Sequence, residues 1–155
     1  MTETMTDAAL TPREHEDLCT LAGLIVPASK RFSVPGADDP IVFADIFASM
    51  RHELNDIRAA LQFVNSRCGE PLASLELAEQ MRVAAELRAM GGRAVDTLTR
   101  HILLCYYRDD RVMRSLGIEP RPPFPGGFPL EQGDWSLLDP VKARPSFWRH
   151  ASQGT

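Results

Sequence analysis

The distribution of proline divides this chain of 155 residues into two segments. Seven of the twelve prolines lie in residues 118–155, together with both tryptophans and three of the seven phenylalanines. Proline lacks a backbone N–H and clashes with the preceding helical turn, so this composition excludes a helix there. The helices are therefore expected in residues 1–117, and residues 118–155 are predicted to form an extended C-terminal arm of the same domain.

The first segment carries apolar side chains at steps of three and four, the spacing of amphipathic helices. Residues 11–14 have the pattern of a capping box with proline at the first helical position, and Pro27 marks the end of this first helix. Residues 1–9, which are small and polar, are predicted to be disordered. Residues 39–64 are predicted to form one long helix, or two that are nearly collinear.

Three further helices are expected before the arm. Ser74 is predicted to cap the third helix, which two glycines at residues 91–92 terminate. Asp110 is predicted to cap a short fifth helix, which Gly117 closes. The apolar stripe of the third helix comprises Leu77, Met81, Ala84, Leu87 and Met90, and that of the fourth comprises Val95, Leu98, Ile102, Leu103 and Tyr106.

No segment alternates apolar and polar residues as a half-buried strand does. The sequence therefore predicts an all-α fold of four to five helices. They are packed as a bundle or as an orthogonal array.

Composition narrows the classes of function. The formal net charge is −4 and no cluster of lysine and arginine is visible, which argues against a nucleic-acid partner. The three cysteines include no CxxC pair, so reduced thiols are expected. The longest near-apolar run, residues 21–28, is far shorter than the roughly 20 residues of a membrane-spanning helix, so no direct membrane insertion is expected. Without a signal peptide or twin-arginine motif, a cytoplasmic location is expected.

One constellation of residues could bind a metal ion. His15 and Cys19 are four residues apart on the first predicted helix, and His101 and Cys105 are four apart on the fourth. Residues with this spacing share one helical face, and two imidazoles with two thiolates suit tetrahedral zinc. The alternative is that both pairs border apolar stripes and are simply packed, since free cysteine behaves as a small hydrophobe. A small helical metal-binding enzyme therefore remains an alternative function.

Other catalytic templates are missing from the sequence. It contains no GxGxxG, P-loop, GxSxG or HExxH pattern. The acidic residues Asp45, Glu53 and Asp56 are interpreted as a solvated helix face. No catalytic or cofactor-binding residue is assigned in this chain.

Four stretches recur in the order of a known family. The first is residues 21–27, followed by the Pro-Gly-Ala at 35–37, and the second is residues 69–75, followed by Glu79 and Gln80. The third is the pair of tyrosines at 106–107, followed by Asp110, Val112 and residues 116–117. The fourth is residues 125–128. Over residues 10–130 the chain resembles the gluconate 2-dehydrogenase subunit 3 family, the small subunit of flavin dehydrogenases.

The resemblance implies a non-catalytic accessory subunit. Such a subunit binds and stabilises a large FAD-dependent oxidoreductase of the glucose-methanol-choline type, which acts on a sugar, an alcohol or a related substrate. FAD and the catalytic residues then belong to the partner. Family members often carry a twin-arginine export signal, which residues 1–6 do not show. A periplasmic location is therefore expected only if a signal-bearing partner exports the chain.

The arm is the expected partner-binding element. Aromatic side chains favour burial, and proline limits the entropy lost on ordering. The surface that covers them is either the chain's own helices, as in a stand-alone helical interaction module, or a partner chain. The residues assigned to partner binding are Tyr107, Phe124, Gly126, Gly127, Phe128, Trp135, Phe147 and Trp148.

Overall fold

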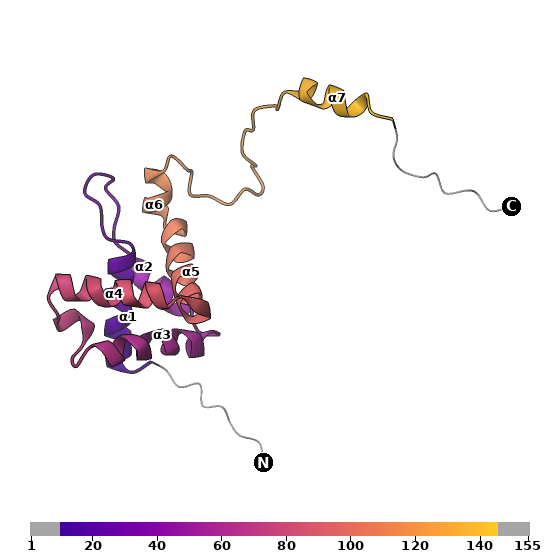
Figure 1. The fold of residues 1–155 in the computed structure, drawn as a ribbon. Helices are drawn as coiled ribbons and strands as arrows, with labels where there is room; N and C mark the ends of the chain where they lie inside the picture. Colours follow the sequence, from indigo (N-terminus) through magenta and orange to yellow (C-terminus); the bar gives the residue numbers. More distant parts are fainter. Residues whose placement is uncertain (1–9, 146–155) are drawn as a thin grey trace, which may run out of the picture. The chain divides into compact units, whose positions relative to one another are not determined.

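A computed structural model describes residues 10–145 of the chain, and its regular elements in this range are all helical (Figure 1). The chain divides into two units, Met1–Pro120 and Arg121–Thr155. The predicted disorder of residues 1–9 lies outside the described residues. The α-helices of the first unit are α1 (Pro12–Ile25), α2 (Pro40–Ser49), α3 (Leu54–Arg67), α4 (Leu77–Met90), α5 (Gly92–Arg108) and α6 (Asp110–Ser115), and the 3₁₀ helix η1 (Leu72–Ser74) precedes α4.

Helix α1 begins as its sequence predicts. The Thr11 hydroxyl accepts the Glu14 backbone N–H at 3.2 Å, and the Glu14 carboxylate accepts the Thr11 N–H at 2.8 Å. This reciprocal capping box satisfies two donors at the helix start. The helix ends at Ile25, two residues before Pro27.

Residues 39–64 form two helices rather than one. Helix α2 ends at Ser49 and α3 begins at Leu54, and a turn closed by the Glu53 N–H to the Met50 carbonyl, at 2.9 Å, separates them. Asp39 caps α2 through the backbone N–H groups of Ile41 and Val42. The residues on both sides of this turn contact α5, as described below.

Two predicted caps are wrong by one or two residues. The N-cap of α4 is Glu76 rather than Ser74, because Ser74 belongs to η1. The N-cap of α6 is Asp109 rather than Asp110, and the Asp109 carboxylate accepts the Arg111 N–H at 2.9 Å.

The ends of α4 and α6 depend on glycine. Gly91 terminates α4 with a φ of 62°, and Gly117 follows α6 with a φ of 74°. Side chains other than glycine rarely adopt such positive values. The predicted glycine stops at both positions are confirmed.

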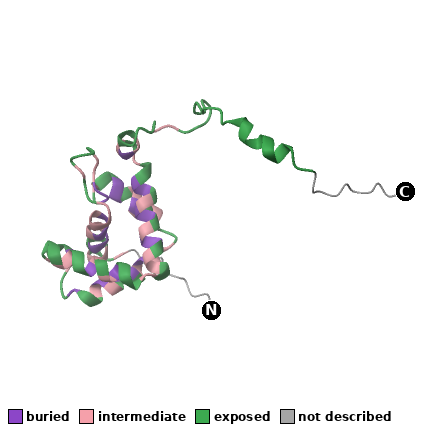
Figure 2. Cartoon of the chain, turned by 45° about the horizontal axis from the view of Figure 1, so that its top comes forward, coloured by how far each residue is buried: buried purple, intermediate pink, exposed green. Residues whose placement is uncertain are grey.

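Helix α5 is at the centre of the first unit and makes its most extensive contacts with α3 and α2. Leu98, Ile102 and Tyr106 are buried, as their spacing predicts. Figure 2 shows the buried residues gathered on the faces that the helices of this unit turn toward one another. The core is completed mainly by Leu18 and Leu21 of α1, Ile46 of α2, and Ile57, Leu61 and Val64 of α3.

The stripe predicted for α4 is largely wrong. Leu87 is buried, but Leu77, Met81 and Met90 are exposed, and the other buried position is Val83. Helix α4 therefore turns only a narrow apolar edge toward the core.

A buried carboxylate joins α1 to η1. Asp17 is fully buried, and one of its oxygens accepts the Leu72 N–H at 2.7 Å. Its other oxygen lies 3.7 Å from Nε of Arg13, one turn earlier on the helix. A buried charge is tolerated only when it is paired and hydrogen-bonded, so this contact fixes the chain that leads into α4.

The second unit contains two short helices, although its composition led us to exclude any. The 3₁₀ helix η2 (Trp135–Leu138) runs into α7 (Asp139–Lys142). Asp134 caps η2 by accepting the Ser136 N–H at 3.0 Å. Pro140 causes no break because it lies in the first turn, where its missing N–H has no helical partner.

Leu98 and Leu104 offer a matched test of the α5 packing. Leu98 has no exposed surface, whereas Leu104 is 59% exposed on the same helix. We expect Leu98→Ala to lower the free energy of unfolding by about 2–5 kcal/mol, because it leaves a cavity in the core. Leu104→Ala should change it by less than about 0.5 kcal/mol. Urea denaturation followed by circular dichroism measures both, and equal losses would contradict this assignment of the core.

Candidate functional site

The second unit exposes large apolar side chains along its whole described length. Phe124 is 84% exposed and Trp135 is 64% exposed. In Figure 2 helix α7 and the residues around it are coloured as exposed. A folded protein rarely leaves so many large apolar groups in water without a binding partner. The exposed set also includes Phe128, Leu130, Leu137, Leu138 and Val141.

A turn at residues 123–127 gives the beginning of this unit a defined conformation. Arg121 donates a hydrogen bond to the Gly127 carbonyl at 2.6 Å, and its guanidinium lies 4.3 Å from the centre of the Phe128 ring. Gly127 has a φ of 61°, which favours glycine at this position, and Gly126 lies beside the Arg121 side chain. These contacts hold Phe128 in place while Phe124 points into solvent. Phe147 and Trp148, the remaining predicted partner-binding residues of the arm, lie outside the described residues.

Tyr107 lies in the last turn of α5. It is 55% exposed, whereas its neighbour Tyr106 is buried and donates its hydroxyl proton to the Pro35 carbonyl at 3.2 Å. The two rings pack edge to face, with centroids 5.3 Å apart. The structure thus places Tyr107 on the surface of the first unit, one helical step from the core.

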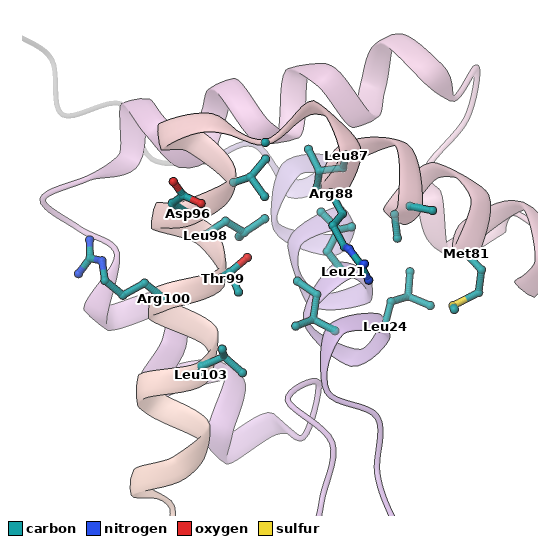
Figure 3. A pocket seen from close by; sticks show the side chains of 15 residues that line it. Leu21, Leu24, Met81, Leu87, Arg88, Asp96, Leu98, Thr99, Arg100 and Leu103 are labelled. Carbon is teal, nitrogen blue, oxygen red and sulfur yellow. The ribbon is translucent and has the colours of Figure 1, made fainter.

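An apolar groove of about 660 Å³ lies between α1, α4 and α5 (Figure 3). The buried side chains of Leu21, Leu87 and Leu98 reach into it, one from each helix. Leu24 and Met81 lie at its edges. Its volume falls within the usual range of ligand pockets, about 300–1,000 Å³. Sequence reasoning missed this groove, because the apolar positions that line it have the same spacing as core positions.

Three charged residues line this groove: Arg88 of α4, and Asp96 and Arg100 of α5. The Arg88 side chain runs from α4 to lie beside Leu21 and Leu24 of α1 (Figure 3). Within residues 10–145, no carboxylate forms an ion pair with it. Arg100 also borders the groove, but its guanidinium is held by both carboxylate oxygens of Glu53, at 2.7 and 2.8 Å. Arg88 is therefore the cation that remains available to an occupant.

The two pairs of histidine and cysteine are not brought together as metal ligands. His15 packs edge-on against the rings of Phe43 and Phe47, both at 5.0 Å between centroids. In the part of the chain that the structure describes, no group of three or more histidine, cysteine, aspartate or glutamate side chains could hold a metal ion. Burial raises the pKa of the Cys19 and Cys105 thiols, and at Cys19 the Asp38 carboxylate adds to the rise. Protonated thiols are poor nucleophiles and poor ligands.

His101 instead joins three elements in a polar network. Its Nδ1 lies 2.9 Å from the Ser49 hydroxyl at the end of α2, and its Nε2 lies 2.7 Å from the Glu53 carboxylate. The Ser49 hydroxyl also donates to the Ile46 carbonyl at 2.7 Å, and the Cys105 thiol donates to Ser49 at 3.4 Å. His101 is buried, so this serine, histidine and glutamate form a packing junction between α2, α3 and α5.

The acidic residues that we interpreted as a solvated face are paired with α5. Asp45 binds the Arg108 guanidinium through both oxygens, and Asp56 accepts from Arg93 at 2.9 Å. The Arg108 hydrogen bonds lower the pKa of Asp45. With Glu53 and Arg100, these pairs form an ionic seam along one side of α5, and the solvated-face prediction is corrected accordingly.

The chain matches no model of a protein family, no curated protein and no solved structure. The resemblance to the gluconate 2-dehydrogenase subunit 3 family stays a prediction from the sequence. In the range 10–145, no helix has both the length and the apolar character needed to cross a membrane.

The seam predicts a defined dependence of stability on pH. Hydrogen bonds from Arg100 and then His101 lower the pKa of Glu53. A carboxyl with a lowered pKa in the folded state stabilises the fold above its unfolded pKa, about 4.3, and this contribution is lost as the pH falls through the folded value. We expect Glu53→Gln to reduce stability at pH 7 and to make its loss between pH 5 and pH 3 shallower. Urea denaturation across this range measures the effect.

The exposed Glu16 provides the control for this test. Glu16→Gln should leave both the stability at pH 7 and the acid dependence close to those of the wild type. Identical acid dependence of the wild type and Glu53→Gln would show that the hydrogen bonds to Glu53 do not contribute to stability.

Proposed function

We propose that this chain is a non-catalytic accessory subunit that binds and stabilises a large FAD-dependent dehydrogenase. The observation that carries the proposal is the exposure of large apolar side chains from Phe124 to Val141. Burying apolar surface is favourable by about 25 cal/mol per Å², so covering these side chains is a strong drive to association. Tryptophan is also enriched among the residues that dominate interface energies, which makes Trp135 the expected anchor.

The identity of the partner is supported by the sequence resemblance. It implies that FAD and the catalytic residues reside in the large subunit, whose substrate is a sugar, an alcohol or a related compound. The small subunit then contributes apolar contacts and conformational support. The exposed Tyr107, on the first unit, offers a further contact of the aromatic type that interfaces favour.

The test is co-expression of the chain with a large flavoprotein encoded next to it, followed by affinity purification through a tag on the small chain. We expect the two to co-purify with FAD bound to the large chain, and we expect the flavoprotein to be more active and more heat-stable than when expressed alone. Absence of co-purification together with unchanged flavoprotein activity would refute the proposal.

A pair of substitutions in the second unit tests the role of its aromatic residues. The double variant Phe124→Ala, Trp135→Ala should weaken partner binding by at least about tenfold, the size of a hot-spot effect. Its thermal unfolding should remain that of the wild type, because both side chains are exposed. Phe32→Ala removes an aromatic ring that is also exposed, but on the first unit, and should leave binding unchanged. Equal binding of the wild type and the double variant would exclude these residues from the interface.

A further inference from the structure

The groove between α1, α4 and α5 is part of a longer apolar strip. Leu77, Met81, Ala84 and Ala85 lie on one face of α4 at helical spacing, and Arg88 follows one turn later. Met81, Ala84, Ala85 and Arg88 line the groove, whereas Leu77 lies beyond it and is exposed. At 1.5 Å per residue, the strip from Leu77 to Arg88 is about 16 Å long. A compact small molecule would cover only the hollow, so the length of the strip favours an elongated occupant.

The regular spacing of the strip residues indicates what kind of element could pack against them. A stripe with the period of a helix arises where one helix packs against another. In α4, Val83 and Leu87 are buried and Ala84 packs against the core. Among the described residues of the first unit, none covers Leu77 and Met81, which stay exposed. An amphipathic helix lying in an apolar groove is a recurring mode of protein recognition.

The groove carries charges of both signs: Asp96 lines it from α5, and Arg88 lines it from α4. Arg88 lies over the apolar side chains of α1 and forms no ion pair in the described part of the chain. Beside an apolar surface, a charge is screened less than in open solvent. An acidic side chain at the edge of the docked helix would therefore pair with it favourably and would fix the register of docking.

We propose that this groove receives an amphipathic helix of the flavoprotein partner, with an apolar face of about three turns and an acidic residue opposite Arg88. The inference rests on the proposed function, since the flavoprotein supplies the helix. It adds a second contact surface, on the first unit, to the apolar residues of the second unit.

Two substitutions in the full-length chain test the groove. Met81→Asp places a charge at its edge, and Arg88→Glu reverses its cation. Both residues are exposed, so neither change removes a core contact. We expect each to weaken binding of the flavoprotein by at least about tenfold in a titration at low salt. Thermal unfolding of the free variants, followed by circular dichroism, checks that they remain folded.

The matched controls are Ile41→Asp, which charges an exposed apolar position on α2, and Arg51→Glu, which reverses an exposed cation between α2 and α3. Neither residue lines the groove, and both variants should bind within about twofold of the wild type. Arg88→Met separates charge from apolar contact. Its affinity should depend less on salt than that of the wild type, because the ion pair is the screened part of the interaction.

The outcomes distinguish this inference from the proposed function. If the wild type binds the flavoprotein and both groove variants bind equally well, the groove is not the docking site, although the accessory-subunit proposal stands. If the wild type does not bind the flavoprotein, both proposals fall. If the chain alone forms a dimer that Met81→Asp dissociates, the occupant is a second copy of this chain, and the inference is overturned.

Discussion

The arrangement of the first unit depends on the contacts of His101 with the turn between α2 and α3. This imidazole, buried on α5, lies within hydrogen-bonding distance of Ser49 on one side of the turn and Glu53 on the other. His101 therefore contacts residues on both sides of the interruption between α2 and α3. Arg100, the residue before His101 in α5, binds the same Glu53 carboxylate, which extends the junction to the ionic seam. A buried imidazole with partners on both nitrogens is costly to disrupt, because either loss leaves a polar atom unsatisfied.

The sequence predicts those features of the fold that depend on neighbouring residues. The capping box of α1 and the glycine stops after α4 and α6 follow from local chemistry and are confirmed. The stripe of α5 is confirmed at Leu98, Ile102 and Tyr106, whereas Val95 and Leu103 are only partly buried. The sequence left open whether residues 39–64 form one helix or two, because the contacts that the turn between α2 and α3 makes with His101 join residues about fifty positions apart. The acidic residues of the seam look like a solvated face for the same reason, since their arginine partners lie on α5. For the candidate site, the sequence identified the apolar arm but not the groove, because periodicity does not distinguish an uncovered helix face from a core-facing one.

Helix α4 shows how a failed prediction can carry information. Its stripe has the regular spacing of a buried surface, yet Leu77 and Met81 are exposed. Its buried apolar positions are only Val83 and Leu87, with Ala84 partly buried beside them. Local sequence and observed packing usually agree in natural proteins, and disagreements concentrate at functional sites. The exposed stripe therefore points to a binding surface of the protein.

The two apolar surfaces of the chain, the groove of the first unit and the exposed side chains of the second, are built on different backbone structures. The groove lies on rigid helices, so a helix that enters it loses its own freedom while the groove loses almost none. The second unit presents its aromatic residues on short helices and turns, in which proline has already restricted the backbone. When two surfaces on one chain contact the same partner, the second contact forms at a high effective concentration. Modest contacts on each surface can then give a long-lived complex, which is the property that the proposed accessory subunit would require.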